Sequence, residues 1–193
     1  APYKNRILGM LNCGWVINNN NQAVPSKSRG IDSLGNAWFV SNFKSVENTD
    51  DEFNALSDPD INLKSTVIVN QEFKELLSDF DYNPNAKIKL NVQDYKPNHL
   101  IYSLKNITSN HLAVFSEIYY EKGWNAYIDG KKVPYFRGNY ILRAMIIPKG
   151  TEKIEFKFEP SSYYTGESLA MVSSIILLLL LGFLSYKEFR YHR

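Results

Sequence analysis

Residues 153–186 read KIEFKFEPSSYYTGESLAMVSSIILLLLLGFLSY, and this stretch contains both structural parts of the chain. Within residues 153–159 apolar side chains alternate with charged ones, which is the pattern of a strand with one buried face. Residues 168–186 carry no charge, and about 19 such residues are enough for a helix to cross the hydrocarbon core of a bilayer. The stretch therefore predicts a β-domain followed, after a short linker at residues 161–167, by one C-terminal transmembrane helix.

The apolar segment has two alternative interpretations, a buried core helix and an amphipathic surface helix. A chain of 193 residues leaves little room for a core around so uniform a helix, and its few small polar residues do not form the polar face of a surface helix. The basic tail, residues 187–193, marks the cytoplasmic side by the positive-inside rule. We therefore expect residues 1–167 to lie outside the cytoplasm and the C-terminus to lie inside it.

The chain contains 22 Lys and Arg against 20 Asp and Glu, a formal net charge of +2. The tail carries this excess, so residues 1–167 are neutral and lack the basic surface that nucleic-acid binding requires. A neutral surface suits a partner such as carbohydrate. Cys13 is the only cysteine, which excludes an internal disulfide and a cysteine-based metal site. The domain must therefore be stabilised by its hydrophobic core, for which about 160 residues are sufficient.

Short strands separated by turn signals recur at intervals of roughly 10 residues. Besides residues 153–159, strands are predicted at residues 37–43, 65–70, 86–92, 100–107, 112–120, 124–128, 131–136 and 140–147. Asp129-Gly130 favours a type I′ hairpin turn, because both positions accept positive φ. This arrangement is typical of a mainly β fold, a β-sandwich or a jelly-roll-like domain.

Short helical segments are predicted in the first half of the chain. Residues 6–17 indicate a short helix that runs into a strand, residues 50–57 a helix capped near Asn48, and residues 71–77 one or two helical turns. We divide the chain into a mixed α/β part at residues 1–85, a β-sandwich part at 86–160, a linker at 161–167, a transmembrane helix at 168–186 and a cytoplasmic tail at 187–193.

The densest aromatic region covers residues 116–140. Exposed aromatic rings can stack on sugar rings, since they combine an apolar face with a polar tip. Alternatively these side chains fill the core, because aromatic residues are favoured in strands. We expect Trp124 to belong to the core and Tyr120 and Tyr135 to be exposed. Tyr120 and Tyr135 are therefore candidate sugar-stacking residues.

Glu117 and Glu121 are candidate acids, but a glycosidase needs two converging carboxylates, and the sequence places no second one beside either. Arg137 and Arg143 could bind an anion, although arginines on adjacent strands more often form ion pairs. The histidines show no metal-ligand spacing: His99, His111 and His192. We expect no catalytic residue, no cofactor and no metal site in this chain.

Residues 115–160, FSEIYYEKGWNAYIDGKKVPYFRGNYILRAMIIPKGTEKIEFKFEP, strongly resemble the closing segment of YfhO-type bacterial membrane proteins. The shared positions are Ser116, Glu117, Tyr120, Gly123, Trp124, Ile128, Asp129, Gly130, Asn139, Arg143, Pro148, Gly150, Ile154, Phe156 and Pro160. Upstream, ILGMLNCGWVI (7–17) and LGNAWFV (34–40) are similar to two further family segments. Glu121-Lys122 departs from the family, which usually has a single proline before the glycine, and lengthens that turn by one residue.

The resemblance implies a parent protein with many membrane helices, of the GT-C-like class of glycosyltransferases. Such proteins are expected to use lipid-linked sugar donors and to modify cell-envelope glycopolymers outside the cytoplasm. Their catalytic acids are expected in an early loop, N-terminal to this chain, so no catalytic residue carries over and we expect the chain itself to be non-catalytic. The role that does carry over is an extracytoplasmic accessory β-domain followed by the last membrane helix, in the bacterial cytoplasmic membrane.

The chain does not begin with methionine, and residues 2–17 lack a secretory signal pattern. We therefore expect a C-terminal fragment whose partners are the membrane, the N-terminal helices of its parent, and an envelope glycan or lipid-linked sugar. The small residues Ser173, Ser174 and Gly182 are the expected contacts to those helices. Two alternatives remain open, a carbohydrate-binding module on a membrane anchor and a purely structural or assembly domain.

Overall fold

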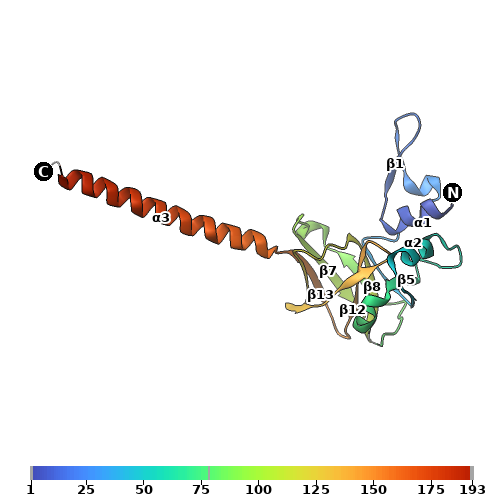
Figure 1. Cartoon of the computed structure of the whole chain (residues 1–193). Helices are drawn as coiled ribbons and strands as arrows, with labels where there is room; N and C mark the ends of the chain where they lie inside the picture. Colours follow the sequence, from blue (N-terminus) through green and yellow to red (C-terminus); the bar gives the residue numbers. More distant parts are fainter. Residues whose placement is uncertain (1, 78, 192–193) are drawn as a thin grey trace.

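The computed structural model describes residues 2–77 and 79–191. Figure 1 shows a β-rich domain from which a single long helix, α3 (Ser161–Tyr191), projects far beyond the strands. This confirms the prediction of a mainly β fold with a few short helices and a C-terminal apolar helix.

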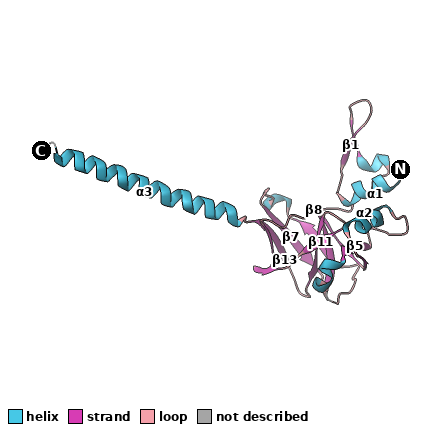
Figure 2. Ribbon diagram, viewed as in Figure 1, coloured by secondary structure: helices cyan, strands magenta, loops and turns pink. Residues whose placement is uncertain are grey.

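The strands of the described residues form three sheets, drawn in magenta in Figure 2. The smallest pairs β1 (Trp15–Ile17) with β2 (Ala23–Pro25). The five-stranded sheet has the order β10 (Lys131–Val133), β9 (Trp124–Ile128), β13 (Lys153–Phe158), β7 (His99–Lys105) and β6 (Lys87–Leu90). The six-stranded sheet has the order β3 (Ala37–Val40), β8 (His111–Ile118), β12 (Leu142–Ile147), β11 (Phe136–Gly138), β5 (Thr66–Asn70) and β4 (Asn42–Val46).

The helices of the domain are short: α1 (Pro2–Met10), α2 (Thr49–Ser57), and the 3-10 turns η1 (Ser26–Arg29), η2 (Gln71–Leu76) and η3 (Val92–Asp94). The sequence explains where α2 begins. The Asn48 side-chain oxygen accepts a hydrogen bond from the Asp51 backbone N–H at 2.9 Å, as the capping pattern predicted. The three acidic residues of the first turn add a favourable interaction with the helix dipole.

The two large sheets pack face to face as a β-sandwich, because one face of each sheet contributes side chains to a shared core. Tyr102, Phe115 and Phe156, from three strands of both sheets, meet between the sheets, with the Tyr102–Phe115 and Phe115–Phe156 ring centroids each 5.0 Å apart. The opposite face of the six-stranded sheet forms a second core, which α1 and α2 cover with Met10 and Leu56. Strands from both halves of the chain therefore share one sheet.

One predicted strand is wrong in detail, because residues 131–136 do not form a continuous strand. β10 ends at Val133 in the five-stranded sheet, and β11 begins at Phe136 in the six-stranded sheet. Pro134 lies at the break and has no N–H to donate to a ladder. The chain thereby crosses between the sheets.

Two turns explain where neighbouring strands begin and end. Asp129 and Gly130 have φ of 46° and 84°, as the predicted type I′ turn requires. Asn139 and Tyr140 also have positive φ, 49° and 72°, which delays the start of β12 to Leu142. The Asn139 side-chain oxygen accepts a hydrogen bond from the Ile68 backbone N–H at 2.9 Å and fixes this turn against β5.

Only two residues separate β13 from α3, and backbone hydrogen bonds hold the start of this junction to the residues that precede β7 and β9. The Phe158 N–H donates to the Asn98 carbonyl at 2.8 Å, and the Glu159 N–H donates to the Gly123 carbonyl at 2.6 Å. Residues 161–167, expected to be a linker, form the first turns of α3. Every described residue of α3 whose exposure is given is exposed, and its apolar window has a mean hydropathy of 2.4, so α3 is a candidate membrane span.

Candidate functional site at the α3-proximal end

Two loops flank the start of α3, since β7 and β9 lie on either side of β13. Residues 92–98 precede β7. Residues 118–123 consist of the last residue of β8, Ile118, and the loop that leads to β9. We call these two loops the α3-proximal end. Figure 1 shows the green segment that contains η3 beside the first turn of α3. Tyr120, one of the residues that the sequence proposed for sugar stacking, belongs to this end, and Tyr135 and the buried Arg143 contact it.

Tyr120 and Tyr135 lie together at this end but differ in exposure. Tyr120 is 52% exposed, as expected. Tyr135 is half-buried rather than exposed, because its ring packs against Phe156 at 5.5 Å and Tyr119 at 5.4 Å. Its hydroxyl donates to the Tyr120 carbonyl at 3.2 Å and also lies 3.3 Å from the Trp124 carbonyl. Tyr135 therefore fixes the loop that presents Tyr120.

Arg143 is buried beneath this loop and is only 2% exposed. Its guanidinium carbon lies 4.2 Å from the ring centroid of half-buried Trp124 and 4.9 Å from that of Phe156. A desolvated cation over an aromatic face gains about 2 kcal/mol, which offsets part of the cost of burying the charge. The Nε–H donates to the Ile118 carbonyl at 3.1 Å. Aromatic rings thus replace the ion pair expected for Arg143, because within the described part of the chain no carboxylate lies within 4 Å of it.

Two further polar groups face the same region. Glu117 is half-buried, and burial raises its pKa, while the nearby positive charge of Arg143 opposes the rise. Tyr102 is fully buried, and burial together with the charge of Glu117 raises the pKa of its hydroxyl. Among the described residues, Tyr102 Oη and Arg143 Nη1 have no hydrogen-bond partner. The cluster therefore contains one cation, one carboxyl group and two unused donors, but Tyr102 and Arg143 are both buried, so these donors are not accessible to a ligand from solvent.

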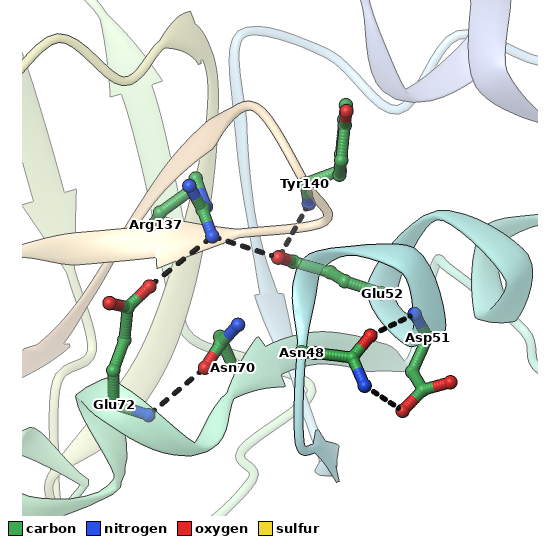
Figure 3. A network of polar contacts seen from close by, with 7 residues as sticks. All are labelled: Asn48, Asp51, Glu52, Asn70, Glu72, Arg137 and Tyr140. Atoms are coloured by element: carbon green, nitrogen blue, oxygen red, sulfur yellow. Dashed lines mark hydrogen bonds and ion pairs between the residues drawn. The ribbon is translucent and has the colours of Figure 1, made fainter.

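A second charged cluster lies at the other side of the six-stranded sheet (Figure 3). Arg137 Nη2 on β11 contacts Glu52 Oε2 at 3.2 Å and Glu72 Oε1 at 3.3 Å, so the ion pair expected for Arg137 is confirmed. The Tyr140 N–H donates to Glu52 Oε1 at 2.7 Å. Burial raises the pKa of Glu52, although the Tyr140 N–H and Arg137 lower it. Because Glu52 is fully buried, this cluster joins α2 to β11 and offers no carboxylate to a substrate.

The remaining candidate residues have structural partners. His99 Nε2 lies 2.9 Å from Glu155 Oε1, and His111 is buried with its ring centroid 5.1 Å from that of Phe39. Over residues 2–77 and 79–191 no three His, Cys, Asp or Glu side chains are arranged to hold a metal ion. His192 lies outside the described residues.

A groove of about 470 Å³ lies beside α1 and is lined by Arg6, Asp32 and Lys64 among others. Arg6 is engaged there, since its guanidinium donates to the carbonyls of Asp58 and Ile61. The charge of Arg6 is therefore used within the fold and is not free to bind a ligand in this groove.

The sequence did not point to Tyr102 or to the aromatic burial of Arg143. One signal was present, because Arg143 is the only charged residue in the strand LRAMII, residues 142–147. Alternation along that strand places Arg143 on the same face as Met145 and Ile147, which belong to the core between the sheets.

The comparisons with known proteins gave one match. The family described as "Bacterial membrane protein YfhO" matches residues 17–170, which is well over half of the chain and contains the whole α3-proximal end. No curated protein and no solved structure matches the chain significantly.

Proposed function

This chain belongs to the YfhO family of bacterial membrane proteins, and we propose that it is an accessory domain, with the last membrane helix, of a polytopic glycosyltransferase. The parent protein would transfer sugar from a lipid-linked donor to cell-envelope glycopolymers. In this arrangement residues 1–167 lie outside the cytoplasm and the basic tail inside it. The chain itself holds no catalytic residue; it shapes or caps the acceptor site that the parent's membrane helices build.

The junction between the sandwich and α3 carries this proposal. Two residues, Glu159 and Pro160, connect the last strand to the candidate span, and hydrogen bonds to Gly123 and Asn98 hold the junction to both flanking loops. A sandwich attached so closely cannot move freely away from a membrane-embedded α3. The α3-proximal end therefore faces the bilayer surface, where the head of a lipid-linked donor would be presented.

The test separates attachment from position. Inserting a six-residue Gly/Ser segment between Pro160 and Ser161 of the intact membrane protein keeps the domain tethered but frees its placement. Sugar transfer in membrane vesicles should fall by about tenfold or more, since small misplacements of binding groups cost this much. The matched control inserts the same segment between Asp129 and Gly130, at the opposite end of β9, and should leave transfer unchanged.

Two results contradict the proposal. One is sugar transfer by residues 1–193 alone, which would make the chain itself the enzyme. The other is undiminished transfer after the Pro160–Ser161 insertion, at unchanged protein level, which would remove any role for the placement of the domain and favour a purely structural or assembly role.

A second candidate function, carbohydrate binding, is favoured by the exposed ring of Tyr120 beside Tyr135. It predicts that the full chain in detergent binds an envelope glycan and that Tyr120→Ala abolishes binding. Tyr135→Phe, which removes only the hydroxyl that fixes the loop, should weaken binding without abolishing it. Phe43→Ala removes an exposed ring elsewhere and is the matched control. Failure of the full chain to bind any envelope glycan would rule this function out.

A further inference from the structure

Large apolar side chains gather at the α3-proximal end. Within residues 4–77 and 79–160, ten large hydrophobic side chains are exposed, and four of them belong to this end. Val92 is 74% exposed, Tyr95 52%, Ile118 54% and Tyr120 52%. The two loops contain only 13 residues, so this is a strong local excess, and exposed apolar patches of this kind mark interaction surfaces.

The patch lies at a defined height relative to the apolar part of α3. Seven residues, 161–167, separate the start of α3 from the uncharged segment that begins at Ser168. At a rise of about 1.5 Å per residue they extend roughly 10 Å. The headgroup region of one leaflet is roughly 5–8 Å thick. If Ser168 lies at the edge of the hydrocarbon, the start of α3 therefore lies roughly 2–5 Å outside the headgroups. A tyrosine side chain that projects from the neighbouring loops toward the bilayer spans this gap.

The first turns of α3 fit the same environment. Tyr163 and Tyr164 are 62% and 52% exposed and lie within the segment that crosses the headgroup region. Tyrosines are enriched at this level of a membrane, because the ring is apolar and the hydroxyl can contact water and headgroups.

We propose that the α3-proximal end docks on the bilayer surface, with Val92, Tyr95, Ile118 and Tyr120 inserted among the lipid headgroups; this rests on the proposed membrane span of α3. The loops contain two basic and two acidic residues, Lys96 and Lys122 against Asp94 and Glu121, so their charges cancel. Docking is therefore driven by apolar and aromatic contact and is independent of anionic lipid. The sandwich is thereby held upright on the membrane.

The test measures depth with a single fluorescent label. Cys13 is the only cysteine, so Cys13→Ser gives a cysteine-free chain in which Gln93→Cys is labelled with a nitrobenzoxadiazole dye. The full chain is reconstituted in phosphatidylcholine vesicles that contain lipid with a spin label on the headgroup. Docking predicts that the dye at position 93 is quenched. A dye at Lys131→Cys, at the far end of the hairpin formed by β9 and β10, should not be quenched.

A matched pair of tyrosines tests the apolar basis of docking. Tyr95 and Tyr82 are each 52% exposed, but Tyr82 lies away from the α3-proximal end. The combined variant Tyr95→Ser and Tyr120→Ser should lose the quenching at position 93, whereas Tyr82→Ser should retain it. Quenching should not change between low and high salt or on addition of anionic phosphatidylglycerol. Quenching that requires the anionic lipid would overturn the proposed mechanism.

A second label separates failure of docking from failure of the span. A dye at Leu178→Cys, in the middle of the apolar segment, should be quenched by a lipid that carries its spin label deep in the acyl chain. Deep quenching at position 178 without headgroup quenching at position 93 overturns the docking proposal and leaves the span intact. Absence of deep quenching at position 178 overturns the span itself, and with it the proposed function.

Discussion

Replacing Glu52 by alanine tests whether the charged cluster between α2 and β11 stabilises the fold. Glu52 is fully buried, accepts the Tyr140 N–H at 2.7 Å and contacts Arg137 at 3.2 Å. Loss of one partner of a buried ion pair typically costs 3–5 kcal/mol. Because Glu72 still contacts Arg137 after the change, and because burial raises the pKa of Glu52, the lower end of this range applies. We expect Glu52→Ala to lower the free energy of unfolding by about 3 kcal/mol.

The assay is urea unfolding of the full chain in detergent micelles, followed by tryptophan fluorescence, to which Trp38, buried in the same core as Leu56 of α2, contributes. Glu72→Ala is the matched control, since Glu72 contacts the same arginine but its side chain is 56% exposed. Glu72→Ala should lower the free energy of unfolding by less than about 1 kcal/mol. Equal losses for the two variants would refute the argument that burial determines the contribution.

The pH dependence provides a second signature of Glu52. Its raised pKa means that the folded chain binds this proton more tightly than the unfolded chain. The resulting stabilisation is complete below the ordinary glutamate pKa and is lost as the pH rises through the raised pKa. The difference in unfolding free energy between the native chain and Glu52→Ala should therefore shrink as the pH rises through this window. A difference that grows with pH would contradict the direction of the shift.

Three further predictions use the same unfolding measurement. Gly138→Ala should lower the free energy of unfolding by about 1–3 kcal/mol through overpacking, because the added Cβ would lie 2.7 Å from Val67 Cγ2 and 3.2 Å from Ala144 Cβ. Gly14→Ala is the control and should not show this loss, because no atom lies within 4 Å of the Cβ that it adds. Arg143→Met should lower the free energy of unfolding by less than about 1 kcal/mol and Arg143→Ala by about 3 kcal/mol, since methionine fills the space between the rings without a buried charge. Equal losses for the two variants would show that the charge itself is required. Burial raises the pKa of Glu155, but hydrogen bonds from Lys153 and His99 outweigh it and lower this pKa. The Glu155 carboxylate therefore stabilises the fold above the ordinary glutamate pKa, and this stabilisation is lost as the pH falls through the lowered pKa. Glu155→Gln should therefore reduce the loss of stability below about pH 5, and an unchanged acid transition would count against this role.

Local signals predicted much of the fold, because the interactions behind them are local. The alternating strand at residues 153–159, the Asp129-Gly130 turn and the Asn48 cap each depend on neighbouring residues, and the structure confirms them. The separation of β10 and β11 into different sheets was not predictable in this way. Pro134 indicates a break within residues 131–136, but the sheet that β11 joins depends on pairing between distant residues, such as Gly138 with Val69.

The candidate site was predictable only in part for the same reason. Aromatic density identified the region that contains Tyr120, but the burial of Tyr135 depends on contacts with Phe156, which is remote in the sequence. Asp50, Asp51 and Glu52 look equivalent as acids of a first helical turn. Only Glu52 is buried, because it lies on the face of α2 that contacts β11. Tertiary contacts, and not residue type, separate the structural acid from the exposed ones.

The central claim, that α3 spans the membrane with the sandwich outside the cytoplasm, is tested most directly by cysteine accessibility in intact bacteria. The intact membrane protein, without other cysteines, carries either Lys131→Cys in the sandwich or Lys187→Cys at the start of the basic tail. A membrane-impermeant maleimide should label position 131 in intact cells and position 187 only after permeabilisation. Labelling of position 187 in intact cells, with protection of position 131, would contradict the account.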